Sequence, residues 1–208
     1  MERRINVITL GDSGVGKTSI INRFRDGTYK ENIELTLGID ICVIKRKFEN
    51  KNITISLHLR DTAGQEIYQT LPISYIRDSH IVLLVFSNIE TLDKIKNRWY
   101  NLYKKEANIE NSRFILVGNK SDIFGDQRDD IVKQGKQFAE EIDAHFITCS
   151  AKSADNLDNL ESFMITEAKR YINEEEKMKK YNDNNNQDKK FSIKNQKDDD
   201  SKKSKCKC

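Results

Sequence analysis

The 208-residue chain has few of the features of metal-binding or membrane-spanning proteins. Its four cysteines lack the paired spacing of a cysteine metal site. Cys42 and Cys149 lie in strand-like segments, and we expect both to be buried, reduced thiols. The longest apolar run, Ile81–Phe86, has six residues, whereas a membrane-spanning helix needs about 20. The sequence therefore predicts neither a cysteine-bound metal nor a transmembrane helix.

The folded part of the chain also lacks net charge. Residues 182–208 contain eight lysines and five aspartates, and their net charge of +3 equals the formal net charge of the whole chain. The net charge of residues 1–181 is therefore zero. Nucleic-acid binding needs a basic face on the folded part, so no nucleic-acid partner is expected. The N-terminus leads directly into a strand-like run, so we expect no signal peptide. Glu2, where a glycine would be required, argues against N-myristoylation.

Short apolar runs alternate with segments of helical periodicity. The predicted strands are Ile5–Leu10, Leu37–Phe48, Asn52–Leu59, Ile81–Phe86, Phe114–Val117 and Phe146–Thr148. The predicted helices are about Thr18–Arg25, Thr91–Glu106, Gln127–Ile142 and Leu157–Met178. The second and third strands form a hairpin through Glu49–Lys51. This order predicts an α/β fold: a six-stranded, mostly parallel sheet with one antiparallel strand, helices on both faces, and ligands at the carboxyl ends of the strands.

A glycine-rich stretch, Gly11–Ser19, follows the first strand and opens the first helix. Glycines in this setting let backbone N–H groups approach phosphates, Lys17 neutralises the β- and γ-phosphate oxygens, and the Thr18 hydroxyl binds Mg²⁺. An ordinary glycine turn is the alternative, disfavoured because strand, loop and helix all lie where the motif needs them. The stretch predicts a P-loop that contacts a nucleoside triphosphate through Ser13, Gly14, Val15, Gly16, Lys17, Thr18 and Ser19.

The segment Asp61–Glu66 comes after the third strand. Asp61 is placed to hold Mg²⁺ through a water molecule, and the N–H of Gly64 to reach the γ-phosphate. The amide of Gln65 is placed to orient an attacking water. Alone, these residues could equally form an ordinary turn. Together with the phosphate loop, they predict catalytic roles for Lys17 and Gln65.

Asn119-Lys120-Ser121-Asp122 follows the strand Phe114–Val117. A carboxylate at Asp122 would accept hydrogen bonds from N1–H and the exocyclic amine of guanine, whereas adenine would leave that charge unpaired. A polar loop is the ordinary alternative, and the pattern also disfavours an ATP-dependent phosphotransferase. We expect Asn119, Lys120 and Asp122 to bind the base, and Ser150-Ala151-Lys152 to close the pocket.

These motifs, in this order and spacing, resemble the Ras superfamily of small GTPases over about residues 4–178. Gly-Asp-Ser-Gly-Val-Gly-Lys-Thr, Leu37-Gly38-Ile39-Asp40 and the Cys206-Lys207-Cys208 terminus resemble its Rab branch. The resemblance implies a GTP/GDP switch that hydrolyses GTP. It also implies that Thr36 closes on Mg²⁺ and the γ-phosphate, giving metal contacts at Thr18, Thr36 and Asp61, and that Tyr29 packs on guanine.

The surface that reads partners departs from the Rab pattern. Of the aromatic residues usual there, only Tyr75 remains, and the differences lie at Ile33, Ile41, Arg60, Ile67 and Ser87. The resemblance implies an exchange factor, a GTPase-activating protein (GAP), a GDP-dissociation inhibitor and a prenylation escort. These departures leave the effectors open. Two alternatives also stay open: a GTP-binding interaction module with little hydrolysis, and another branch of the superfamily.

The last 30 residues differ in composition from the rest. We predict a small GTPase domain over 1–178 and a disordered tail over 179–208, since Asn182–Ser204 is polar and without periodicity. Cys206 and Cys208 resemble a double geranylgeranylation site, and Cys208 ends the sequence, which excludes a Cys-a-a-X box. The resemblance implies a protein on the cytoplasmic face of an intracellular membrane, with a cytosolic pool and a role in vesicle traffic.

Overall fold

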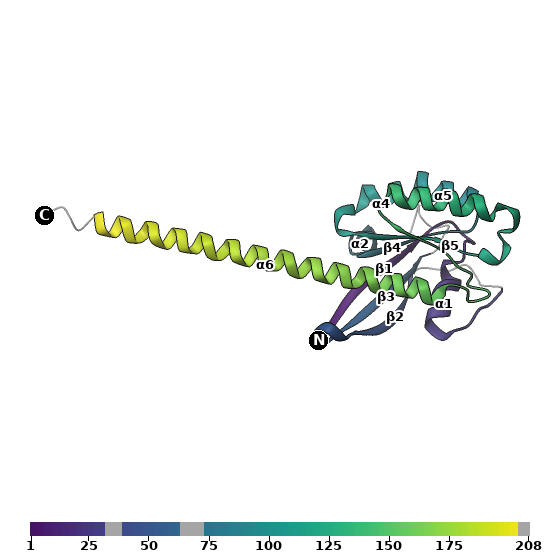
Figure 1. The fold of residues 1–208 in the computed structure, drawn as a ribbon, viewed down its shortest axis with the longest axis horizontal. Helices are drawn as coiled ribbons and strands as arrows, with labels where there is room; N and C mark the ends of the chain where they lie inside the picture. Colours follow the sequence, from purple (N-terminus) through teal and green to yellow (C-terminus); the bar gives the residue numbers. More distant parts are fainter. Residues whose placement is uncertain (32–38, 63–72, 204–208) are drawn as a thin grey trace. The chain divides into compact units, whose positions relative to one another are not determined.

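A computed structural model describes residues 1–31, 39–62 and 73–203 (Figure 1). Six strands form one sheet in the order β2-β3-β1-β4-β5-β6. Their bounds are β1 Glu2–Leu10, β2 Ile39–Phe48, β3 Ile53–Thr62, β4 Ile81–Phe86, β5 Arg113–Gly118 and β6 His145–Thr148. β2 pairs antiparallel with β3, and the other neighbours are parallel. The predicted mixed α/β sheet is confirmed.

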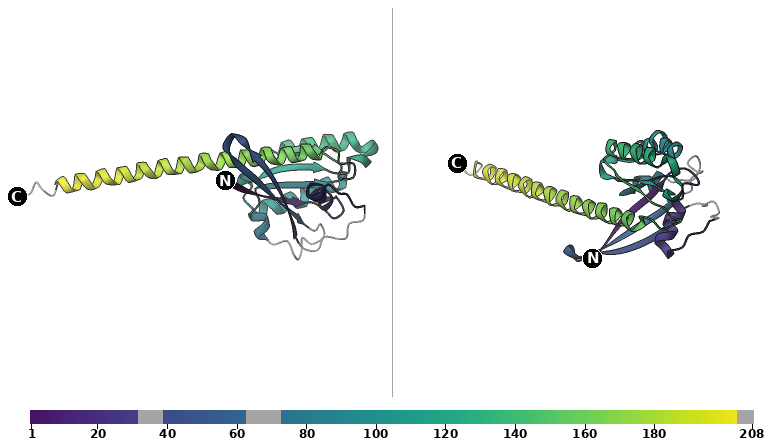
Figure 2. Two further views of the ribbon diagram at one scale, coloured as in Figure 1. Left: turned by 90° about the horizontal axis from the view of Figure 1, so that it is seen from below. Right: turned by 45° about the vertical axis from the view of Figure 1, so that its right-hand side comes forward.

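Helices cover both faces of the sheet (Figures 1 and 2). Their bounds are α1 Lys17–Asp26, α2 Ile73–Arg77, α3 Ile89–Lys94, α4 Tyr100–Glu106, α5 Arg128–Glu141 and α6 Leu157–Lys203, with a π-helical turn, η2, at Ile95–Trp99. Short 3-10 turns occupy Glu49–Lys51, Ile109–Asn111, Ser121–Ile123 and Gly125–Gln127. The helix predicted over Thr91–Glu106 is thus three segments, α3, η2 and α4, joined end to end.

The core follows the two-residue period of the strands. Val82, Leu84 and Phe86 of β4 pack with α3, η2 and α5 in one buried cluster. The alternate β4 residues, Leu83 and Val85, are fully buried as well. Successive side chains of a strand point to opposite faces, so burial of both sets requires cover on both faces. β4 therefore consists entirely of buried apolar residues, as a central parallel strand should.

Several strand ends differ from the sequence prediction by one to three residues, and the difference at the carboxyl end of β3 bears on the site. β3 continues past Leu59 to Thr62 because β2 pairs with it along its whole length, up to Ile39 opposite Thr62. Asp61 consequently lies inside the strand end. Residues 32–38 and 63–72, which belong to the expected switch segments 30–40 and 61–77, lie outside the described ranges.

The structure also differs from the expected disordered tail. α6 runs to Lys203, beyond the helix end predicted at Met178. No glycine or proline follows Gly135, so neither of these helix-breaking residues interrupts α6. The contacts divide the chain into two units, Met1–Ala168 and Lys169–Cys208, and the sheet lies in the first. A domain boundary at residue 178 stays a prediction.

The burial pattern predicts very different costs for two isoleucines. Ile8 of β1 is fully buried, whereas Ile41 of the edge strand β2 is 41% exposed. We expect Ile8→Ala to lower the free energy of unfolding by about 2–5 kcal/mol, and Ile41→Ala by less than about 1 kcal/mol. Urea unfolding of both variants would measure this difference, and equal losses would contradict the assigned core.

Candidate functional site

The loop Gly11–Gly16 connects the carboxyl end of β1 to the start of α1. Gly16 caps α1 with φ 95°, and a Cβ built there would lie 2.2 Å from Nδ2 of Asn119. A Cβ on Gly11 would lie 2.1 Å from the carbonyl oxygen of Val85. Both positions therefore require glycine. The first turn of α1 carries no side-chain cap and no acidic residue, which leaves its N–H groups and dipole available to an anion.

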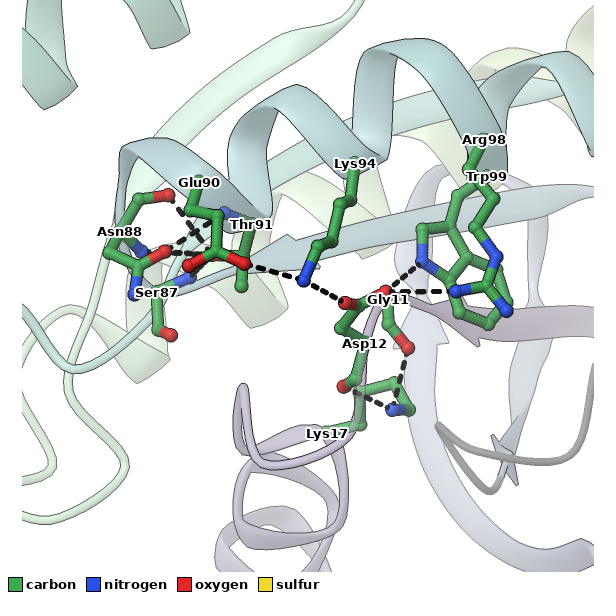
Figure 3. A network of polar contacts seen from close by, with 10 residues as sticks. All are labelled: Gly11, Asp12, Lys17, Ser87, Asn88, Glu90, Thr91, Lys94, Arg98 and Trp99. Atoms are coloured by element: carbon green, nitrogen blue, oxygen red, sulfur yellow. Dashed lines mark hydrogen bonds and ion pairs between the residues drawn. The ribbon is translucent and has the colours of Figure 1, made fainter.

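Lys17 lies beneath this loop with only 5% of its surface exposed. Its Nζ donates hydrogen bonds to the carbonyl oxygens of Gly11 at 2.9 Å and Asp12 at 3.0 Å (Figure 3). Burial lowers the pKa of Lys17 to about 8, and the carboxylates of Asp61 and Asp12 oppose that shift. A phosphate beside Nζ would favour the charged form further. The predicted phosphate-binding lysine is thus buried within hydrogen-bonding distance of the phosphate loop.

Asp61 offers a buried oxygen beside this lysine. The residue is 2% exposed, and its Oδ1 has no hydrogen-bond partner among the described residues. Burial raises the pKa of Asp61, while a hydrogen bond from Thr18 and the charge of Lys17 lower it. An unpartnered buried carboxylate oxygen next to a hydroxyl fits a hard cation such as Mg²⁺. The third predicted metal contact, Thr36, lies outside the described residues.

A cavity of about 170 Å³ lies beyond the loop, at the carboxyl ends of β5 and β6. Its lining consists of Ser19, Tyr29, Asn119, Lys120, Asp122, Ile123, Ala151 and Lys152. All of these except Ile123 are residues for which the sequence predicts nucleotide binding. The fold therefore gathers α1, the loop after it and two strand ends around a single hollow, although they are distant in sequence.

Two side chains organise the far wall of this cavity. Asn119, 1% exposed, donates from Nδ2 to the carbonyl oxygen of Val15 at 2.8 Å and accepts from the N–H of Ala151 at 3.1 Å. Asp122 accepts a 2.6 Å hydrogen bond from the hydroxyl of Ser150 on one carboxylate oxygen, Oδ1. Asn119 therefore joins the phosphate loop to the segment Ser150–Lys152, which we call the base loop. Ser150 orients the carboxylate of Asp122.

Comparison of the sequence with known proteins identifies the family. The family model described as the Ras family matches residues 6–173. The chain is 35% identical over 164 residues to Ras-related protein RABD2b of Arabidopsis thaliana, which covers 78% of each chain. The chain belongs to the Ras family. Ras-related protein Rab-1A of Dictyostelium discoideum is 35% identical over 165 residues, 78% of this chain and 79% of the relative. GTP-binding protein ypt1 of Schizosaccharomyces pombe is 35% identical over 154 residues, 73% of each chain.

This Rab-like small GTPase holds its base pocket together with an arginine that motif reasoning missed. Arg23 of α1 donates 2.7 Å hydrogen bonds to the carbonyl oxygens of Ala151, Lys152 and Gly27. Its guanidinium also lies 5.7 Å from the centre of the Tyr29 ring. Arg23 therefore connects two walls of the cavity. Nothing in its local sequence marks it, because its partners are backbone atoms up to 129 positions away.

The altered partner-reading surface of the GTPase has its own internal contacts. Arg60 is one of the positions at which the chain departs from the Rab pattern, where the resemblance implies a tryptophan, and it is 3% exposed. It donates to the carbonyl oxygen of Tyr75 at 3.0 Å, pairs with Asp78 at 2.7 Å and lies 4.6 Å from the Tyr75 ring centre. Ile41 pairs with Arg60 across the sheet. A buried, stacked cation thus occupies the place where the resemblance implies an aromatic ring.

Several predicted residues cannot be placed. Thr36, Gly64 and Gln65 of the nucleotide site, together with Cys206 and Cys208 of the tail, lie outside the described residues. Their roles stay predictions. Cys42 and Cys149 are buried and unpaired, as expected, and burial raises the pKa of Cys149 to about 12.

Arg23→Met should accelerate GDP release by about tenfold. The substitution keeps the aliphatic stem but removes donors to three carbonyls, and 1.4 kcal/mol corresponds to a factor of ten. Release of fluorescent mant-GDP measures the rate. Arg25→Met is the matched control, because Arg25 on the same helix contacts Asp40, Asn22 and Cys42 and not the carbonyl oxygens that Arg23 binds. Equal rates of GDP release from the two variants would show that Arg23 does not stabilise the nucleotide pocket.

Proposed function

We propose that this GTPase is a membrane-anchored GTP/GDP switch that regulates vesicle traffic. The observation that supports it best is the continuous site formed by the phosphate loop, buried Lys17 and Asp61, and the cavity at Asn119 and Asp122. One end suits phosphates and a cation, and the other suits a flat base with paired donors. Ser19, at the end of the phosphate loop, lines the cavity, so the two ends adjoin as a nucleotide requires.

The proposed chemistry divides between the two ends of this site. Asp122 accepts from guanine, and Tyr29 packs on the base. Lys17 neutralises the phosphates, and Thr18, Thr36 and Asp61 (through water) hold Mg²⁺, which would supply charge stabilisation when bound. Gln65 orients the attacking water. Arg98 of η2 pairs with Asp12 of the phosphate loop, and the sequence motifs assign no arginine finger, so intrinsic hydrolysis is expected at about 10⁻⁴–10⁻² s⁻¹, with acceleration by a GAP.

The switch depends on contacts to the γ-phosphate. In the GTP form, Thr36 and Gly64 hold segments 30–40 and 61–77, and hydrolysis removes those contacts. An exchange factor, a GAP and a GDP-dissociation inhibitor would act on the two forms. Ile41 exposes an aliphatic side chain where the resemblance implies an aromatic one, and the buried Arg60 lies opposite it in the sheet, so we expect the effectors to differ from those of a typical Rab.

Anchoring is proposed to come from the C-terminus. No helix in the described ranges is long and apolar enough to span a membrane. Two prenyl chains at Cys206 and Cys208 would give stable attachment, where one gives only marginal binding. Neighbouring lysines would add about 1 kcal/mol each at an anionic leaflet. A prenylation escort and a cytosolic pool follow from this arrangement, with the active form on the cytoplasmic face of an intracellular membrane.

The second candidate is a GTP-binding interaction module with little hydrolysis. The departures at Arg60 and Ile41 favour this second candidate, because a GAP that contacts aromatic residues at these two positions would find an arginine and an isoleucine there. Single-turnover hydrolysis with and without candidate GAPs separates the two functions.

Gln65→Leu should lose most GAP-stimulated hydrolysis and keep wild-type GTP affinity, because leucine cannot orient water. Single-turnover release of phosphate measures the GAP-stimulated hydrolysis, and binding of mant-GTP measures the affinity for GTP. Gln69→Leu, at the nearby glutamine, is the matched control and should hydrolyse normally. Unchanged turnover in Gln65→Leu would exclude Gln65 from the mechanism.

Cys206→Ser and Cys208→Ser should weaken membrane attachment in steps. Each single variant keeps one prenyl site and should shift partly into the soluble fraction, and the double variant should shift completely. Fractionation of cells that express each variant, with mass spectrometry of the wild-type C-terminus, measures the effect. Unmodified cysteines in the wild type would contradict the proposed anchor.

A further inference from the structure

The phosphate loop contains a carboxylate, Asp12, close to where a triphosphate would bind. Like charges at such distances repel by several kcal/mol in a medium of low polarity. Figure 3 shows that the Asp12 side chain turns out of the loop toward the helix formed by α3 and η2. There it is only 15% exposed. The negative charge of Asp12 therefore has to be compensated by other groups of the protein if a triphosphate is to bind at the phosphate loop.

The helix formed by α3 and η2 places three side-chain groups against the Asp12 carboxylate. Nε1 of Trp99 donates to Oδ1 of Asp12 at 2.8 Å, and Nζ of Lys94 lies 3.1 Å from Oδ2. Nη1 of Arg98 lies 3.8 Å from Oδ1. Burial would raise the pKa of Asp12, but the hydrogen bonds from Trp99 and Lys94 outweigh it and keep the pKa below its ordinary value. The carboxylate is therefore ionised and paired.

The π-helical turn explains how these groups converge. In an α-helix of about 3.6 residues per turn, residues five apart point in different directions. A π turn closes hydrogen bonds between residues five apart, so Lys94 and Trp99, at its two ends, can both face Asp12. The turn spans Ile95–Trp99. A helix predicted from periodicity alone would not place both side chains on the loop.

The charges at this contact are closely balanced. Lys94 also binds Glu90 at 2.7 Å, so one lysine serves two carboxylates. Asp12 in turn uses its carbonyl oxygen to accept a hydrogen bond from Lys17. Loss of Lys94 would leave Asp12 with Trp99 and the more distant Arg98, and would remove the lysine from Glu90.

We propose that Lys94, Trp99 and Arg98 act as positioning residues that neutralise the charge of Asp12. Through this neutralisation they set the preference of the site for GTP over GDP. The effect is electrostatic and acts through Asp12. GTP carries more negative charge than GDP, so an uncompensated Asp12 penalises GTP more. This inference rests on the proposed assignment of the phosphate loop to the nucleotide phosphates.

The test uses the full-length protein and measures affinity for mant-GDP and for a non-hydrolysable mant-GTP analogue at low and high salt. Lys94→Gln should weaken binding of the GTP analogue about three- to tenfold and of GDP less, with the difference largest at low salt. Lys96→Gln is the matched control, because Lys96 on the same helix lies over the Phe138 ring instead. It should change neither affinity by more than about twofold.

The double variant Asp12→Asn with Lys94→Gln identifies the mechanism. An asparagine keeps an acceptor for Trp99 but removes the charge, so it should restore the wild-type ratio of the two affinities. Equal losses for both nucleotides in Lys94→Gln, or no restoration in the double variant, would overturn the inference. A wild-type protein that binds neither nucleotide would instead refute the proposed function. Thermal unfolding confirms that each variant is folded.

Discussion

The buried amide of Asn119 is the interaction on which the nucleotide site depends. It binds the carbonyl of Val15 on one side and the N–H of Ala151 on the other, so it joins the phosphate loop to the base loop. A buried amide that lost either partner would cost about 1–3 kcal/mol. The same side chain excludes any Cβ at Gly16. One residue thereby constrains the backbone that faces phosphate and the backbone that faces the base.

Around this contact the protein buries charges that its own groups only partly satisfy. Lys17 has a lowered pKa, and Asp61 has a raised pKa and a carboxylate oxygen that no described residue hydrogen-bonds. Burial of single charges is costly unless opposite charges or hydrogen bonds compensate. A phosphate beside Lys17 and a cation beside Asp61 would remove both deficits. The site is therefore better matched to a bound nucleotide than to solvent, which links its electrostatics to its proposed chemistry.

Much of the fold could be predicted because its elements have strong local patterns. β4 is a run of six apolar residues and matches its predicted bounds Ile81–Phe86. The end of β3 could not be predicted, since the pairing of Ile39 with Thr62 is a contact between distant segments. The helix beyond Met178 was missed because its composition indicates disorder, while the absence of glycine and proline after Gly135 permits a helix. The π turn at Ile95–Trp99 was missed because periodicity does not distinguish it from an α-helix.

The sequence by itself determined the chemistry of the site. Short motifs such as Gly11–Ser19 and Asn119–Asp122 are proposed to bind through their own backbone and adjacent side chains, so the sequence alone predicts their function. Only the tertiary structure showed which residues support them. Arg23 binds carbonyls of the base loop, Trp99 and Lys94 bind Asp12, and Arg60 stacks on Tyr75. Each of these contacts joins separate elements, and its geometry exists only once the sheet has brought those elements together.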